Sequence, residues 1–279
     1  MTVQEWLGDN QLSIDIWNNK YRHNNESFDE WLDRVSGNNS EIKRLIIEKK
    51  FLFGGRILSN RGISTNASLS NCYVLSVNDS IEDIYKCCSN MARTYSYGGG
   101  VGIDISNLRP RGAAVNNSAK TTSGAVSFMS TFDNVTGVIG QNGRRGALML
   151  SISVNHPDVQ EFINIKANTD QINNANISIR VTDDFMNAVK SKKKRYILSY
   201  PVDAYKPGID TSNWEYDTLY YIDGIYYKMI DPVKLFDTLI QNNYDYAEPG
   251  ILYWDRIDKH NLMDRNTEFK YVGINPLNL

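Results

Sequence analysis

The sequence predicts an α/β protein with a small helical cap at its N-terminus. Residues 12–50 repeat apolar side chains at helical spacing. From about residue 51, short apolar runs separated by glycine and asparagine alternate with helical stretches, a pattern typical of α/β folds. The 279 residues are 41% hydrophobic, which is enough for a well-buried core and excludes disordered and fibrous classes.

The helical cap is expected over residues 1–52. Leu12, Ile16 and Trp17 recur on one helical face, and Ser27 and Glu30 have the spacing of a capping box. The rest of the chain, residues 53–279, is expected to form the larger part of the fold.

Five strands are expected in that larger part, at 72–77, 101–106, 146–154, 176–181 and 251–255. Helices are expected at 80–95, 123–139, 156–167, 183–190 and 232–246. The stretch 191–230 breaks this alternation, and its tyrosine-rich run predicts a hairpin insertion. The basic run at 190–195 is interpreted as a solvated turn.

The charge balance argues against nucleic acid and membrane partners. Lys plus Arg total 30 and Asp plus Glu total 32, so there is no global positive field to attract a polyanion. The N-terminus lacks the pattern of a signal peptide, and no segment approaches about 18 consecutive apolar residues. A cytoplasmic protein is therefore expected.

The three cysteines, an odd number without metal-ligand spacing, are not expected to form a disulfide framework or a structural metal site. Cys72 lies at the head of a predicted strand, where it is either a small packing residue or a functional thiol. Cys87 and Cys88 are adjacent in a predicted helix, point about 100° apart and are expected to pack. None of the three histidines has a His or Cys partner at metal-ligand spacing.

Glycine and arginine mark candidate ligand loops. Residues 97–106, YGGGVGIDIS, place four glycines between a helix and a strand, which suits either close approach to a ligand or a tight turn. Residues 106–113 and 140–147 each set arginines beside glycine. Such loops either clamp phosphates with guanidinium groups or are solvated surface.

Nine segments, taken in order, resemble the catalytic (large) chain of ribonucleotide reductases. They are 53–62, 68–84, 98–112, 123–129, 140–150, 155–166, 176–186, 247–257 and 273–276. The resemblance runs from about residue 12 to Pro276 and is nearest the adenosylcobalamin-dependent branch and its diferric-type relatives.

The resemblance implies a fold and an activity. The fold is a helical N-terminal cap over residues 1–52 followed by the first five-stranded half of a ten-stranded α/β barrel over residues 53–279. The activity is reduction of ribonucleotides to 2′-deoxyribonucleotides by thiyl-radical chemistry, within deoxyribonucleotide synthesis for DNA replication.

The resemblance also implies roles for single residues. Cys72 matches one cysteine of the redox pair, and Asn275 matches an amide that binds the ribose hydroxyls. The implied substrate-facing wall comprises Ser70, Asn71, Gly99, Gly100 and Gly102.

A second implied site binds a deoxynucleoside triphosphate as specificity effector. Asp79 matches its contact to the deoxyribose, and Arg109, at the start of the loop 107–122, matches its contact to the phosphates. Gln141 and Arg145 match the loop that relays effector identity to the substrate site. In the family such effector sites lie at a dimer interface, so a dimer is expected.

The sequence departs from the family pattern after Pro276. The family continues with Cys-x-Glu, which carries the radical cysteine and a catalytic base, whereas this sequence reads Leu277-Asn278-Leu279. We therefore expect a split or interrupted gene and activity only with a complementary C-terminal reductase fragment. The alternatives are a non-catalytic deoxynucleotide-binding module and a non-functional truncated product.

The implied cofactors leave one choice open. The radical source is either adenosylcobalamin or a radical-generating metal subunit, and the reductant is a thioredoxin-type dithiol. No metal ligands are expected in this chain.

Overall fold

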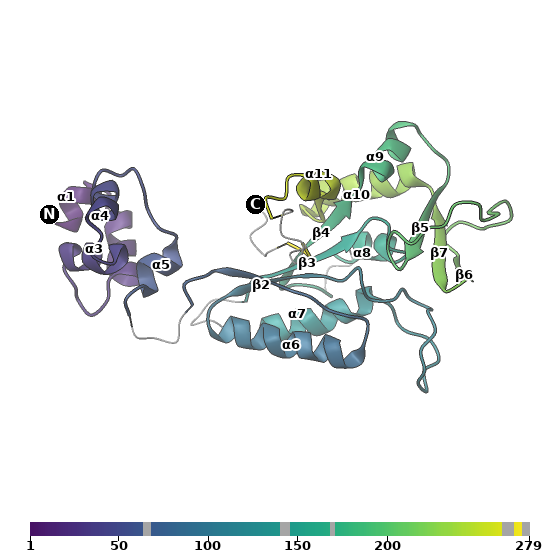
Figure 1. The fold of residues 1–279 in the computed structure, drawn as a ribbon, viewed down its shortest axis with the longest axis horizontal. Coiled ribbons are helices and arrows are strands. Elements are labelled where there is room, and N and C mark those ends of the chain that lie inside the picture. The colour runs from purple at the N-terminus through teal and green to yellow at the C-terminus, as the bar shows by residue number, and fades with distance from the viewer. Residues whose placement is uncertain (64–67, 140–145, 168–170, 264–270, 275–279) are drawn as a thin grey trace. The chain divides into compact units, whose positions relative to one another are not determined.

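The computed structural model of the protein describes residues 1–63, 68–139, 146–167, 171–263 and 271–274 (Figure 1). Packing divides the chain into two compact units, Met1–Asn71 and Cys72–Leu279. This division lies beyond residue 52, the predicted end of the helical cap, and the boundary of that cap stays a prediction.

The first unit consists of short helices. They are α1 (Val3–Leu7), α2 (Gln11–Ile16), the π-helical turn η1 (Trp17–Tyr21), α3 (Phe28–Ser36), α4 (Ser40–Ile47) and α5 (Gly55–Asn60). The capping box is confirmed, because the Ser27 hydroxyl accepts from the Glu30 amide and the Glu30 carboxylate accepts from the Ser27 amide. Phe28 and Trp31 stack in the core of this unit with ring centroids 5.5 Å apart.

One arginine ties three helices of the first unit together. The Arg34 guanidinium donates to both oxygens of Glu26, and it also donates to the carbonyls of Tyr21, Leu58 and Arg61. Both charged side chains are largely buried, so the contacts satisfy groups that would otherwise be costly to desolvate.

The second unit is built on a parallel five-stranded sheet with the order β1-β2-β3-β4-β8. Its strands are β1 (Cys72–Leu75), β2 (Gly100–Asp104), β3 (Leu148–Ser153), β4 (Ala175–Val181) and β8 (Gly250–Tyr253). Its helices are α6 (Ile81–Ser96), the 3-10 turn η2 (Val126–Phe128), α7 (Met129–Val138), α8 (Val159–Asn164), α9 (Asp183–Lys190), α10 (Pro232–Tyr246) and α11 (Trp254–Lys259). The α/β class and all five strands expected from the sequence are confirmed.

Helix starts in the second unit follow from side-chain caps. Ser80 caps α6 and Thr182 caps α9 through amides of the first turn. Asp231 caps α10, and Pro232 follows at the first helical position. Proline lacks an N–H, but at this position the N–H would have no acceptor within the helix, so no hydrogen bond is lost. The helices predicted at 183–190 and 232–246 have these bounds in the structure.

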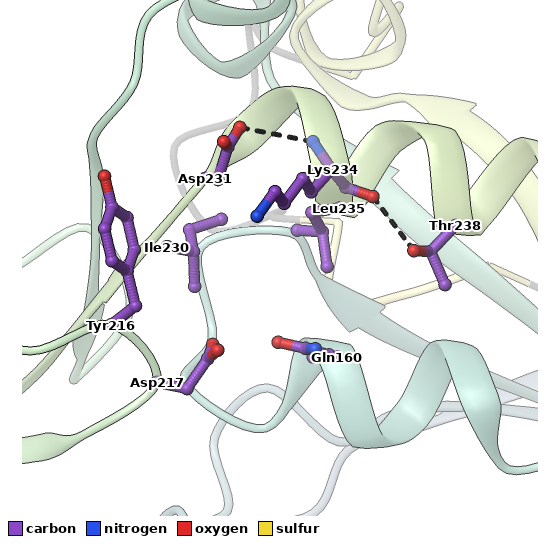
Figure 2. Close-up of a pocket in the computed structure, with 8 residues that line it drawn as sticks. All are labelled: Gln160, Tyr216, Asp217, Ile230, Asp231, Lys234, Leu235 and Thr238. Atoms are coloured by element: carbon purple, nitrogen blue, oxygen red, sulfur yellow. Dashed lines mark hydrogen bonds between the residues drawn. The ribbon is translucent and has the colours of Figure 1, made fainter.

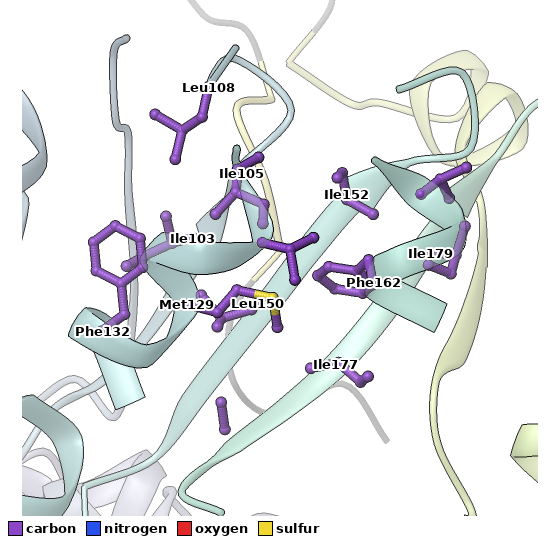
Figure 3. Packing of buried hydrophobic residues seen from close by; sticks show 14 of the residues in the cluster. Ile103, Ile105, Leu108, Met129, Phe132, Leu150, Ile152, Phe162, Ile177 and Ile179 are labelled. Carbon is purple, nitrogen blue, oxygen red and sulfur yellow. The ribbon is translucent and has the colours of Figure 1, made fainter. Parts of the chain in front are cut away.

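Helices α6 to α10 pack on one face of the sheet. Their buried side chains form a single cluster with Val101, Ile103, Leu150 and other strand residues of the same face. Figure 3 shows part of this cluster, with Met129 and Phe132 of α7 and Phe162 of α8 gathered around strand isoleucines. Figure 1 shows α6 and α7 lying side by side along the sheet.

The expected insertion after α9 is a separate three-stranded antiparallel sheet. Its strands are β5 (Tyr196–Tyr200), β6 (Leu219–Ile222) and β7 (Ile225–Ile230), in the order β5-β7-β6. Asp223 and Gly224, both with positive φ, make the two-residue turn between β6 and β7. The hairpin prediction is confirmed, with β5 as a third strand.

No helix in the described ranges is both long enough and apolar enough to cross a membrane.

The packing of α7 on the sheet can be tested with two substitutions in one helix. Phe132 is fully buried, so Phe132→Ala should lower the free energy of unfolding by about 3–5 kcal/mol. Val138 is 71% exposed, so Val138→Ala should change it by less than about 0.5 kcal/mol. Equilibrium urea unfolding measures both, and equal effects would contradict the described core.

Candidate functional site

The two faces of the five-stranded sheet differ in chemistry. Strand side chains alternate between faces, and paired residues of parallel neighbours share a face. The face opposite the helical cluster, called here the polar face, carries small, polar and charged residues in most of its positions. It comprises Cys72, Val74, Gly100, Gly102, Asp104, Met149, Ser151, Ser153, Asn176, Ser178, Arg180, Gly250 and Leu252.

A buried polar network occupies the middle of the polar face. The Asp104 carboxylate accepts from the Ser151 hydroxyl at 2.7 Å and lies 3.0 Å from Nε of Arg180. The Arg180 Nε–H has no hydrogen-bond partner among the described residues, so this contact is a charge contact. Arg180 also donates to Ser106 and lies 4.3 Å above the Trp254 ring.

Gly273 lies over the polar face. A side chain at this position would meet Cβ of Asp104 at 3.4 Å and Cγ1 of Val74 at 3.5 Å. The segment 271–274 therefore approaches strands β1 and β2 closely, which glycine permits because it has no Cβ. Val74 and Asp104 thus point to the same side of the sheet.

Cys72 lies on the polar face at the amino end of β1, paired in register with Gly100. Its side chain is partly exposed. Cys87 and Cys88 of α6 are buried in the cluster on the opposite face. Burial raises the pKa of Cys87 to about 12, and burial also raises the pKa of Cys88. The expectation that these two thiols pack is confirmed.

The glycines expected to line a substrate wall have different surroundings. Gly100 and Gly102 lie on the polar face beside Cys72 and Val74. Gly99 is close to the helix-covered face, where a Cβ would be 2.6 Å from the Tyr73 ring and 2.8 Å from Thr94. Its amide donates to the Thr94 carbonyl, so packing explains this glycine and its substrate role stays a prediction.

Ser70 and Asn71 belong to the first unit. The Ser70 amide donates to the Ser68 hydroxyl, and the Asn71 side chain accepts from Nε of Arg56 at 3.1 Å. Their substrate role stays a prediction. Gln141, Arg145 and Asn275 lie outside the described residues.

The structure brings the two predicted effector residues together. Asp79 Oδ2 accepts from Nε of Arg109 at 2.6 Å, and Asp79 Oδ1 accepts from the Arg109 amide at 3.0 Å. Tyr200, which is not among the residues predicted from the sequence, donates to Asp79 Oδ2 or to the Asn107 carbonyl. Within the described residues, Nη2 of Arg109 makes no hydrogen bond, and the side chain is 33% exposed. A cationic donor is therefore available to an anionic ligand.

Two residues between β3 and α8, His156 and Asp158, hold the backbone before and after Arg109. Asp158 accepts from the amides of Arg111 and Ala125, and its own amide donates to Nδ1 of His156. Nε2 of His156 therefore carries the proton and donates to the Leu108 carbonyl at 2.8 Å. Burial lowers the pKa of His156, which keeps the ring neutral in this role. These contacts give His156 a structural role.

A shallow cleft of about 270 Å³ lies elsewhere in the second unit, between α8, α10 and the chain before β6. Figure 2 shows Tyr216 and Asp217 across the cleft from α10, which contributes Lys234 and Thr238, and from Asp231, the residue that caps this helix. None of the residues predicted from the sequence lines it. Its carboxylates and single lysine define no specific ligand.

Among the described residues, no group of three or more His, Cys, Asp or Glu side chains is placed to hold a metal ion.

Comparison with known proteins relates the chain to one family. Residues 70–271 match the family described as "Ribonucleotide reductase, barrel domain". The chain is similar to the vitamin B12-dependent ribonucleoside-diphosphate reductase of Thermoplasma acidophilum, with 37% identity over 195 residues that cover 69% of this chain and 23% of that protein. It is also similar to the ribonucleoside-diphosphate reductase subunit alpha of Bacillus subtilis, with 25% identity, 84% of this chain and 35% of that protein covered.

A solved structure supports the fold. The class Id ribonucleotide reductase alpha subunit of Actinobacillus ureae superposes with a TM-score of 0.68 and 18% identity, covering 93% of this chain and 42% of that chain. The chain spans only part of its relatives' length, namely 23% of the Thermoplasma acidophilum protein and 35% of the Bacillus subtilis protein.

Thiol reactivity should separate Cys72 from the two buried cysteines. At pH 8, a thiol with a pKa of about 12 has about a thousandfold less reactive thiolate than an ordinary thiol. Iodoacetamide should therefore modify Cys72 first, and Cys87 should react only as the pH approaches 12 or the chain unfolds. Peptide mass spectrometry over time measures this, with labelling in urea as the control. Equal native rates for Cys72 and Cys87 would contradict the described burial.

Proposed function

The chain belongs to the ribonucleotide reductase family, and we propose that it forms the first half of the catalytic barrel of such an enzyme. The observation that carries this proposal is a partly exposed thiol, Cys72, on a sheet face of small and polar residues opposite the helices. A face of this kind can line a substrate cavity, because it leaves room and supplies polar groups.

The proposed reaction replaces the 2′-hydroxyl of a ribonucleotide with hydrogen. Two thiols supply two electrons and two protons, the hydroxyl leaves as water, and the thiols become a disulfide. Cys72 is proposed as one of these thiols. Its partner is proposed to come from the rest of the enzyme, because Cys87 and Cys88 are buried on the opposite side of the sheet. A thioredoxin-type dithiol would then reduce the disulfide.

The radical that starts the reaction is proposed to come from adenosylcobalamin or a radical-generating metal subunit. The relatives include both a vitamin B12-dependent reductase and a subunit alpha. Either group would supply the oxidising equivalent that makes a thiyl radical. We assign no residue of this chain to hold it, and the residues described above serve binding and reduction.

The remaining length of the relatives is proposed to complete the barrel, either on a continuous chain or as a complementary C-terminal fragment. The five parallel strands here would pair with a second five-stranded half. Gly273 over the polar face supports this arrangement, because the chain that leads to Asn275 already lies across β1 and β2. Asn275 is proposed to bind the ribose hydroxyls there.

A deoxynucleoside triphosphate is proposed to bind at Asp79 and Arg109, within a dimer. Arg109 has an available Nη2 and partial exposure, which suit contact with a phosphate. Asp79 is proposed to contact the deoxyribose. Gln141 and Arg145 are proposed to carry information about the bound effector to the substrate site.

The role of Cys72 can be tested in the assembled reductase. Cys72→Ser should leave nucleotide binding unchanged and abolish sustained dithiol-driven turnover, because serine cannot form the disulfide. Multiple-turnover assays of deoxynucleotide formation measure this. The matched control is Cys87→Ser, which should cost about 1 kcal/mol of stability and keep turnover. Wild-type turnover in Cys72→Ser would refute the assignment.

The effector site can be tested by removing one cation. Arg109→Ala should weaken deoxynucleoside triphosphate binding by about tenfold or more, because a charge-assisted phosphate contact contributes about 1.5–3 kcal/mol. Isothermal titration calorimetry on the dimer measures the affinity. Arg111→Ala is the control, because Arg111 is 55% exposed in the same loop and pairs with Glu161. Equal affinities of Arg109→Ala and the wild type would remove Arg109 from the site.

A further inference from the structure

Two tyrosines of the three-stranded insertion sheet lie next to each other in its strands. Tyr200 ends β5, and Tyr226 lies near the start of β7, and the antiparallel register pairs them directly. Directly paired residues project from the same face of a sheet with their Cβ atoms about 4.5–5.5 Å apart. The two phenol groups are therefore neighbours on one surface of the insertion.

Tyr200 reaches the beginning of the loop 107–122. Its hydroxyl lies 2.8 Å from the Asn107 carbonyl and 3.1 Å from Asp79 Oδ2. A hydroxyl has one proton, so it donates to one of these oxygens at a time. The same Asp79 oxygen accepts from Nε of Arg109, so Tyr200 is in direct contact with the ion pair proposed to bind the effector.

Tyr226 contacts the same loop further along the chain, at Ala114. Its hydroxyl accepts from the Ala114 amide at 2.8 Å. The carbonyl of Ala114 accepts from Nη1 of Arg109 at 2.7 Å. The Arg109 guanidinium is therefore fixed at Nε by Asp79 and at Nη1 by Ala114, and each of these two anchors contacts one of the paired tyrosines.

We propose that Tyr200 and Tyr226 form a clamp by which the insertion sheet positions Arg109 and so sets the affinity of the effector site. The inference rests on the proposed effector function for its ligand, a deoxynucleoside triphosphate. The clamp itself rests on three contacts of the tyrosine hydroxyls, namely those of Tyr200 with Asn107 and Asp79 and that of Tyr226 with Ala114. Both tyrosines are positioning residues, because their hydroxyls touch the anchors of Arg109 and not its available Nη2.

Two further observations agree with this role. Burial and the nearby Asp79 carboxylate raise the pKa of Tyr200, so its hydroxyl stays protonated and able to donate at neutral pH. Leu219 of β6 lies 3.8 Å from the position of a Cβ on Gly112, so the insertion also contacts the loop through an apolar side chain.

The test compares three tyrosine-to-phenylalanine variants in the assembled reductase. Tyr200→Phe and Tyr226→Phe should each weaken binding of dTTP or dGTP about three- to tenfold, which corresponds to one lost hydrogen bond. Tyr216→Phe is the matched control. Its hydroxyl donates to the Lys194 carbonyl at 2.8 Å within the same insertion and makes no hydrogen bond with the loop among the described residues.

Calorimetry measures the affinities, and the thermal unfolding midpoint of each variant reports on general damage. Weaker binding in both clamp variants, with midpoints equal to that of Tyr216→Phe, supports the inference. Wild-type affinity in both clamp variants overturns the clamp but leaves the effector site in place.

Hydrogen exchange supplies a second measurement that needs no ligand. Tyr226→Phe should speed exchange in the peptide that contains Ala114, because that amide loses its acceptor. The Tyr216→Phe control should not change this peptide. If the wild-type reductase binds no deoxynucleotide, the effector proposal fails and hydrogen exchange alone decides the clamp: unchanged exchange in Tyr226→Phe overturns it.

Discussion

The alternation of side chains along five parallel strands is the constraint on which the rest of this structure depends. A parallel sheet in a doubly wound fold has two apolar faces, because helices cover both. Here α6 to α10 share one cluster on a single face, and the other face carries glycine, serine, Cys72 and an Asp104–Arg180 pair. A one-residue shift in register would exchange the two faces, so burial of the apolar face also fixes which way Cys72 points.

The loop that follows β2 is held in place by two other segments of the chain, the one between β3 and α8 and the three-stranded insertion. His156 and Asp158, in the chain between β3 and α8, hold the loop backbone from the side of the sheet. Tyr200 and Tyr226 hold it from the insertion. Arg109 is thus oriented by groups from several parts of the chain. A guanidinium held in this way loses less conformational freedom when it binds an anion, which favours affinity.

The sequence predicted the local structure well, because local signals specify it. Apolar runs separated by glycine and asparagine marked all five strands, and helical patterning marked α9 and α10, whose starts the structure shows to be capped by Thr182 and Asp231. The polar network and the Tyr200 contact were not predicted. Tyr200 meets Asp79 across 121 residues of sequence, and Arg180 meets Ser106 across 74. Such pairs follow from strand order and from the placement of the insertion, which periodicity does not encode. Gln141, Arg145 and Asn275 lie outside the described residues, so their roles stay predictions.

The buried Asp104–Arg180 pair is best explained by a requirement other than stability. Desolvation of two charges offsets much of their attraction, and well-packed apolar residues of similar volume are often equally or more stable. An apolar pair here would also extend the hydrophobic core to both faces of the sheet. The charged pair keeps the polar face polar where Gly273 crosses it, and Arg180 links Ser106 to the Trp254 ring at the same time. The proposed role of this face in binding a polar substrate accounts for this cost in stability.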